Sequence, residues 1–176
     1  VGYLSNRNSD SEHFATRLDE VTGKNIYTNL DYGFSIPYAS SSWEGPAETM
    51  DTEAETDYSR INAVFRNAST SEALLIVPEP GDTKSLNDTV TGLDLPYTVV
   101  TVGGLPALRY EYVTPLNEEG TLYGKIVMLT FKGLSKGSIT MAYQQLFPTE
   151  AEAKKASLSR LNELLTHMSF DSATAQ

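Results

Sequence analysis

Apolar and polar side chains alternate along most of the middle of the chain, and this period of two predicts β-strands. Glycine, proline, asparagine or aspartate bound each alternating segment, and these residues favour turns. The strands expected from this pattern are 34–38, 61–66, 73–77, 97–102, 105–113, 123–131 and 138–146. Because most of them follow one another across short turns, we expect sequential antiparallel hairpins.

The clearest hairpin is centred on Gly103–Gly104, since two glycines tolerate the positive φ angles of a two-residue turn. Alternation along the returning strand places Tyr110 and Tyr112 on one face and Arg109 and Glu111 on the other.

Helix signals flank these strands. Ser9 and Glu12 have capping-box spacing and precede apolar residues at helical intervals, which predicts a short helix near 10–22. A second short helix is expected at 86–93, whereas the acidic segment 46–59 is expected to be a loop.

The strongest helix signal lies at the C-terminal end. Thr149 and Glu152 form another capping box, and a helix is expected from about 150 to 168. Its apolar stripe would consist of Ala151, Leu158, Leu161, Leu164, Leu165 and Met168.

These elements predict an α+β fold: a mostly antiparallel sheet of about seven strands, with a long C-terminal helix and a shorter N-terminal helix packed on it. Strict β-α-β alternation is absent, which argues against a doubly wound parallel sheet. The 176 residues fit one domain, which we place at 24–170. Residues 1–23 would form an N-terminal tether with the short helix, and 171–176 a flexible tail.

Composition narrows the function. The chain has 13 basic and 23 acidic residues, a net charge of −10, so phosphate backbones and anionic membranes repel it. The absence of cysteine excludes disulfides, thiol catalysis and iron–sulfur clusters. The segment Val1–Asp10 is rich in Ser and Asn, and we expect it to tether the domain to an export signal or membrane anchor upstream of Val1.

No catalytic pattern emerges from the sequence. His13 and His167 are both expected at the surface, and neither a G-x-S-x-G elbow nor a glycine-rich phosphate loop is present. The alternative is a hydrolase whose residues converge only in space, using carboxylates or a serine with His13.

Acidic residues alternate within 51–57, at Asp51, Glu53, Glu55 and Asp57. Oxygen ligands at this spacing suit Ca²⁺, but the glycine and terminal glutamate of an EF-hand are missing. A solvated acidic loop is therefore favoured, and we predict neither a metal nor a cofactor.

Five aromatic residues fall within 27–43. If exposed, they would line a ligand groove; if buried, they belong to the core, which is the more common arrangement. Arg109 is the cation best placed for a buried ion pair or a carboxylate ligand. The candidate ligand-binding residues are Tyr32, Tyr38, Trp43 and Arg109.

Several short motifs resemble those of PsbP-like domains and of LpqN-type lipoproteins, which share an αβα-sandwich fold. They are Tyr27-Thr28-Asn29, the segment 31–38, Trp43, the segment 103–107, Tyr110-Glu111-Tyr112 and Met168-Ser169-Phe170. The chain departs from the pattern at Tyr38-Ala39, where Tyr-Pro is common, and in its expected N-terminal helix. The resemblance implies an exported, non-enzymatic protein, and it transfers no functional residue.

The sequence thus predicts a non-enzymatic, extracytoplasmic binding or accessory protein, anchored upstream of residue 1. Its partner would be a protein or a small ligand and not a nucleic acid, with membrane contact only through the anchor. A small-molecule carrier with an aromatic-lined groove is the other alternative, besides the hydrolase.

Overall fold

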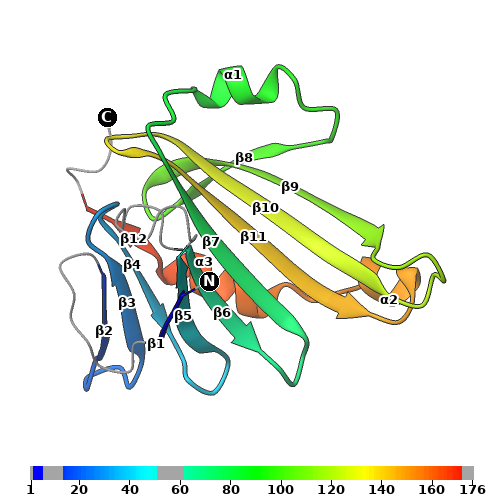
Figure 1. The fold of residues 1–176 in the computed structure, drawn as a ribbon, viewed down its shortest axis with the longest axis horizontal. Helices are drawn as coiled ribbons and strands as arrows, with labels where there is room; N and C mark the ends of the chain where they lie inside the picture. Colours follow the sequence, from blue (N-terminus) through cyan, green and yellow to red (C-terminus); the bar gives the residue numbers. More distant parts are fainter. Residues whose placement is uncertain (1, 6–13, 51–61, 172–176) are drawn as a thin grey trace.

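The computed structural model describes residues 2–5, 14–50 and 62–171, with the backbone alone for 2–5 and 48–50. In these residues the chain forms two antiparallel sheets and three short helices (Figure 1). The larger sheet has eight strands in the order β1 (Gly2–Ser5), β5 (Glu44–Met50), β6 (Asn62–Asn67), β7 (Glu72–Pro80), β11 (Gly137–Phe147), β10 (Tyr123–Leu134), β9 (Leu105–Pro115) and β8 (Thr98–Val102). The smaller sheet has four strands in the order β12 (Ser169–Phe170), β4 (Phe34–Tyr38), β3 (Asn25–Asn29) and β2 (Phe14–Leu18). The helices are α1 (Leu86–Val90), α2 (Glu150–Lys154) and α3 (Ser159–His167).

Strand register gives the eight-stranded sheet two different faces. Val127 lies opposite both Glu111 and Tyr143, so these three side chains share one face. The same face carries the fully buried Leu129 and Phe131, and we call it the covered face. The alternate residues, such as Met128, form the open face.

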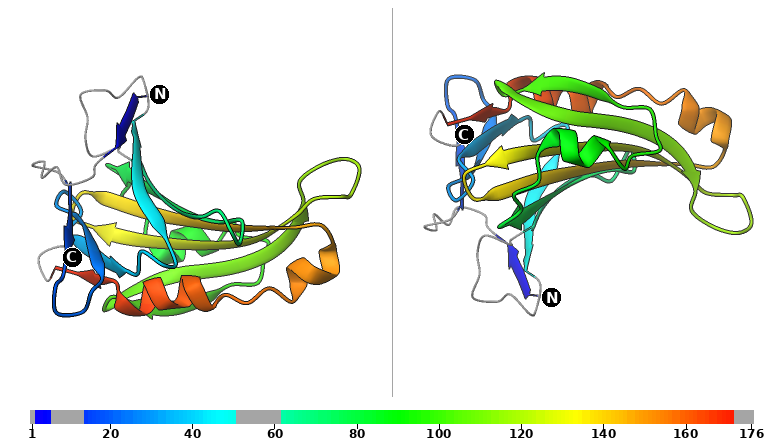
Figure 2. Two further views of the ribbon diagram at one scale, coloured as in Figure 1. Left: turned by 90° about the horizontal axis from the view of Figure 1, so that it is seen from below. Right: turned by 90° about the horizontal axis from the view of Figure 1, so that it is seen from above.

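Two layers bury the covered face. Toward β6, the four-stranded sheet packs its aromatic side chains on Phe65, whose ring lies 6.0 Å from that of Tyr27 and 5.2 Å from that of Tyr38. Alongside this sheet, α3 buries Leu161, Leu164 and Leu165. Figure 2 shows α2 and α3 lying against the same side of the eight-stranded sheet.

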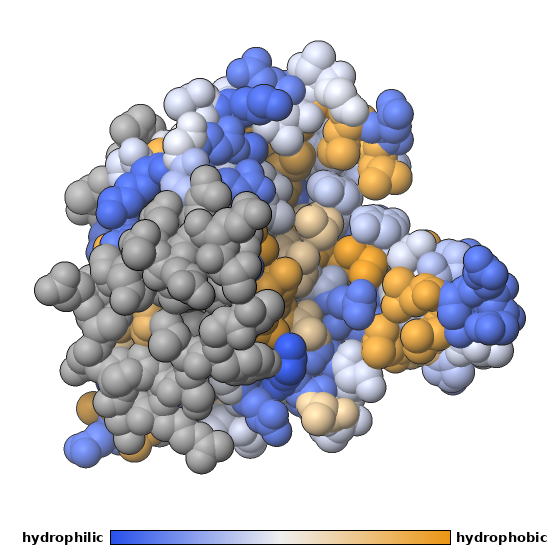
Figure 3. Space-filling model, viewed as in Figure 1, coloured by the Kyte–Doolittle hydropathy of each residue, from blue (hydrophilic) through white to orange (hydrophobic). Residues whose placement is uncertain are grey.

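The chain crosses from β7 to β8 on the open side of the sheet. The crossing contains α1, which Ser85 and Asp88 cap reciprocally, and α1 contacts β10. Figure 3 views the open face, where apolar surface is visible between α1 and the strands below it. Among the described residues, no helix is long and apolar enough to cross a membrane.

The mostly antiparallel sheet is confirmed, and each of the seven expected strands overlaps one in the structure. The short helix expected at 86–93 is present as α1. The strand count was too low, because the described residues form twelve strands in two sheets. One addition is Glu44–Met50, which overlaps the start of the predicted loop 46–59 and pairs with β6 despite its few apolar residues.

The N-terminal helix expected near 10–22 is wrong where the structure describes it. Residues 14–18 form β2 and pair with β3, across a turn in which Asp19 accepts hydrogen bonds from Val21 and Thr22. Leu18 and Val21 are 60% and 95% exposed, so their helical spacing buries nothing. Strand pairing therefore prevails over the local helix signal, and β2 and β3 form a hairpin.

The C-terminal helix is divided into two segments. Thr149 caps α2 as expected, but the helix stops at Lys154, and α3 begins at Ser159, whose N–H donates to the Ser157 hydroxyl. Most of the expected apolar stripe is buried or partly buried, whereas Ala151 is exposed because the break changes the face of α2. His167 is exposed in the last turn of α3, as predicted.

Gly137 supports a prediction about stability. Its φ is +145°, and a Cβ there would lie 2.1 Å from the Glu79 carbonyl oxygen. We expect Gly137→Ala to lower the free energy of unfolding by about 3 kcal/mol or more, through strain and overpacking. Urea denaturation measures the change.

Gly133 provides the matched control, because its φ is +73° but no atom lies within 4 Å of a built Cβ. Gly133→Ala should cost only the left-handed backbone strain, about 1–2 kcal/mol. Equal losses in the two variants would contradict the expected clash at Gly137.

Candidate binding site

The site begins where β8 stops pairing with β9. Thr98 lies opposite Arg109, so continuing the same register would place Pro96 opposite Glu111. Proline has no backbone N–H and cannot donate to a strand ladder. The ladder therefore ends at Thr98, while β9 continues to Pro115 along a sheet edge.

A cavity of about 300 Å³ lies at this junction and is open to solvent. We call it the edge notch, and its lining residues are Pro96, Tyr97, Thr98, Arg109, Tyr110 and Glu111. Figure 3 shows the surface hollowed on its right-hand side, between the segment that leads into β8 and the far ends of β9 and β10.

Exposed apolar side chains are concentrated in the two stretches of chain that line the edge notch. Of the eight large exposed apolar side chains in the described part of the chain, five belong to the segment before β8, to β8 itself, to β9 or to the residue directly after β9. They are Leu95, Tyr97, Val99, Tyr112 and Leu116, which are 37–59% exposed. The rings of Tyr110 and Tyr112 stack at 6.3 Å with an interplanar angle of 13°. Such a concentration is typical of a binding surface, because soluble monomers rarely expose contiguous apolar patches.

Charged groups line the other side of the β9 edge. The Arg109 guanidinium lies 3.6 Å from the Glu111 carboxylate, and Glu111 is also 3.3 Å from the Lys125 ammonium. Arg109 reaches α3 as well, through a 3.4 Å contact with the Asn162 side-chain oxygen. These contacts hold the guanidinium beside the notch with its charge partly balanced.

Tyr110 is partly withdrawn from water. Its desolvation raises the pKa of the phenol, and the neighbouring Tyr112 adds to the increase. Tyr110 therefore presents a neutral hydroxyl, which is both a donor and an acceptor of hydrogen bonds.

The structure separates the four candidate residues predicted from the sequence. Tyr32, Tyr38 and Trp43 are only 2%, 4% and 3% exposed and belong to the core, so they line no surface groove. Arg109 alone lies at the notch. Sequence reasoning did not identify Tyr97 or Pro96 as site residues, although a proline two residues before the β-branched run 98–102 marks a strand that cannot pair further.

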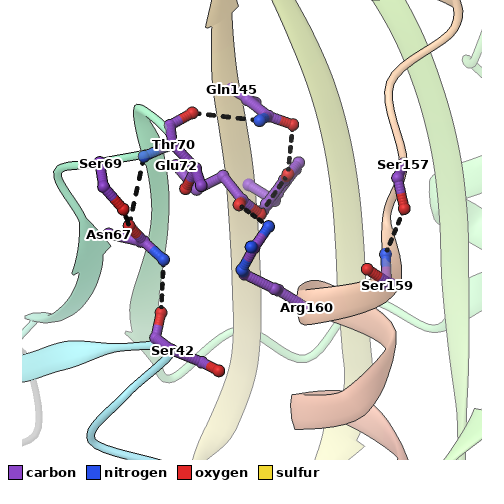
Figure 4. A network of polar contacts seen from close by, with 10 residues as sticks. Ser42, Asn67, Ser69, Thr70, Glu72, Gln145, Ser157, Ser159 and Arg160 are labelled. Atoms are coloured by element: carbon purple, nitrogen blue, oxygen red, sulfur yellow. Dashed lines mark hydrogen bonds and ion pairs between the residues drawn. The ribbon is translucent and has the colours of Figure 1, made fainter.

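A buried polar network, also missed by the sequence, lies under the covered face. The Glu72 carboxylate, whose side chain is 1% exposed, accepts hydrogen bonds from Arg160 at 3.1 Å and from the Tyr143 hydroxyl at 2.7 Å. Gln145 lies beside Tyr143 and donates to the Thr70 carbonyl. Figure 4 shows Glu72, Gln145 and Arg160 turned toward one another. The network joins α3 to β7 and β11, so its evident role is to position the helix.

A second polar cluster lies at the opposite end of the sheet. Lys132 pairs with Asp82, and the buried Ser138 hydroxyl donates to the same carboxylate at 2.7 Å. These two hydrogen bonds hold the pKa of Asp82 well below its usual range. A carboxylate with a lowered pKa is a weak base, which argues against a role for this cluster in activating Ser138 as a nucleophile.

Two other sequence hypotheses lie outside the described residues: His13, and the acidic loop 51–57 with its possible Ca²⁺. Within the described ranges, no three His, Asp or Glu side chains converge as a metal site would require.

Tyr143 generates a prediction about pH. Burial, followed by its hydrogen bond to Glu72, raises the pKa of the phenol above the ordinary value of about 10. Above that pH the unfolded state loses the phenol proton while the folded state keeps it, so wild-type stability falls by up to about 1.4 kcal/mol per pH unit.

Tyr143→Phe removes the ionising group and one hydrogen bond to a buried carboxylate. We expect a loss of about 1–3 kcal/mol in the free energy of unfolding at pH 8, from urea titrations. The gap between wild type and variant should narrow above pH 10. A gap that stays constant up to pH 11 would contradict the raised pKa.

Comparison with models of known protein families gives no match, and no curated protein matches the chain in sequence.

Proposed function

We propose that the chain is a non-catalytic binding module whose edge notch and adjoining apolar side chains contact a protein partner or a small ligand. The observation that carries this proposal is that the exposed Tyr97 lines the cavity, while four more exposed apolar side chains lie on the same two stretches of chain, at Leu95, Val99, Tyr112 and Leu116. Burying these side chains against a partner would stabilise the complex by about 25 cal/mol for each Å² of apolar area removed from water.

The chemistry of the notch supports recognition rather than turnover. Tyrosine supplies an apolar ring with a polar tip, and tyrosine and arginine are enriched in binding hot spots. Arg109 and Glu111 offer one cation and one anion to a polar group on the partner. The volume of about 300 Å³ lies at the small end of ligand pockets, which favours one side chain or a small molecule as its occupant.

The same proposal places the module outside the cytoplasm, as an exported accessory protein. This part is supported only by the resemblance of its short motifs to PsbP-like domains and LpqN-type lipoproteins. No observation on the described residues favours the hydrolase, because its candidate base, His13, lies outside them.

Site-specific photo-crosslinking in cells of the source organism tests the proposed surface. With benzoyl-phenylalanine in place of Tyr112, which is 37% exposed beside the notch, we expect a discrete adduct after irradiation. With the same group in place of Leu18, which is 60% exposed in the smaller sheet, we expect none. Mass spectrometry identifies the adduct.

A further variant separates crosslinking of a specifically bound partner from crosslinking after random collision. Tyr97→Ser changes the notch but leaves position 112 in place, so it should reduce the yield of the Tyr112-position adduct several-fold. Equal adduct patterns from positions 112 and 18, or no adduct at either, would contradict this surface as the binding site.

A further inference from the structure

The backbone direction along β9 can be read from one hydrogen bond. Leu116, directly after β9, donates its N–H to the Leu122 carbonyl at 2.8 Å, toward the β10 side. Backbone groups alternate in direction along a strand, so the even-numbered residues Tyr110 and Tyr112 also point toward β10. The N–H and C=O groups of Glu111 and Val113 therefore point away from the sheet, along the line that β8 would follow.

These outward groups have no backbone partner among the described residues. The register of β8 ends with Thr98 opposite Arg109, and no further bond joins Pro96 to Glu111. Glu111 and Val113 thus offer two donors and two acceptors in the alternating arrangement that an antiparallel strand requires. An extended peptide satisfies all four at once, which neither a helix nor a small molecule does.

The notch closes one end of this edge. A strand added beside Glu111 and Val113 would run in line with β8 and end against Pro96, Tyr97 and Thr98. The notch lies beside β9, whose residues Arg109, Tyr110 and Glu111 form part of its lining. An added strand would therefore stop at the notch, and this stop would determine which of its residues lies opposite each residue of β9.

Side chains on β9 indicate which peptide fits. The residue opposite Tyr112 would form a non-hydrogen-bonded pair, in which facing side chains lie closest. Aromatic and β-branched residues stabilise such a pair with a tyrosine. At long range the net charge of −10 of the whole chain attracts a positively charged segment and repels a second copy of this chain, while at this edge Arg109 and Lys125 are both paired with Glu111.

We propose that the edge of β9 over residues 110–115 binds an extended, positively charged peptide segment by strand addition, with an aromatic or β-branched residue opposite Tyr112. This inference rests on the proposed function, since it names the partner class of the same surface. It also specifies that the backbone of Glu111 and Val113 makes the bonds.

Amide exchange followed by NMR tests the backbone contacts directly. In the protein alone, the amides of Glu111 and Val113 should exchange fast, whereas those of Tyr110 and Tyr112 should be protected by β10. The probe is a synthetic peptide that carries the sequence of Thr98–Val102 between two lysines. At about ten times its Kd, we expect exchange at Glu111 and Val113 to slow about tenfold.

Val113→Pro provides the decisive variant. Proline removes the outward N–H, and it is tolerated on an edge strand because that N–H does not bond within the sheet. We expect it to weaken peptide binding at least tenfold, whereas Val113→Ala, which keeps the N–H, should stay within about threefold. Protection at Tyr110 and Tyr112 verifies that both variants keep the fold.

Three outcomes would overturn strand addition: slow exchange at Glu111 and Val113 in the protein alone, no added protection with the probe at millimolar concentration, or equal binding by the two variants. The crosslinking experiment separates these from failure of the proposed function. If the adduct at position 112 persists undiminished in Val113→Pro, the surface binds its partner through side chains and only the strand addition is wrong. If no adduct forms in either background, the proposed function fails as well.

Discussion

The structure depends on burying one face of an eight-stranded sheet, and Phe65 lies at the centre of that burial. Its side chain is fully buried, with the rings of Tyr27, Tyr38 and Trp43 edge-on at 6.0, 5.2 and 6.5 Å. Edge-to-face aromatic pairs add about 0.5–1.5 kcal/mol each beyond the area that they bury. The cluster attaches the smaller sheet to the larger one, and it withdraws the N-terminal aromatic residues from any role at the surface.

The smaller sheet leaves the rest of the covered face to the helices. Leu161, Leu164 and Leu165 bury the apolar side of α3, while Arg160 reaches the buried Glu72 carboxylate. A buried carboxylate without a partner is costly, so this ion pair favours one placement of the helix over a slide along the sheet. Asn162 on the same helix contacts Arg109, which links the position of α3 to the edge notch.

The edge notch forms where Pro96 lacks the backbone N–H that would extend the pairing of β8 with β9. Pro96 cannot extend the β8 ladder, so β9 keeps two residues with outward backbone groups beside exposed tyrosines. Exposed strand edges invite association, and proteins commonly protect them with charges or a covering segment. Here the edge carries the Arg109–Glu111 pair on one side and an aromatic pair on the other, an arrangement that suits a selective contact.

The sequence by itself determined the middle of the fold and one residue of the site, Arg109. Alternation located the main strands, and the Gly103–Gly104 turn fixed the register that brings Thr98 opposite Arg109. A two-residue turn permits only one pairing of its flanking strands, so these residues were bound to meet.

Tertiary structure alone decided the remaining features. Residues 14–18 joined a sheet against their helical spacing, because backbone pairing with β3 outweighs a weak capping signal. Burial of Tyr32, Tyr38 and Trp43, like the exposure of Tyr112, depends on which layer packs on which face. Local periodicity assigns side chains to a face, but it does not reveal whether another layer covers that face.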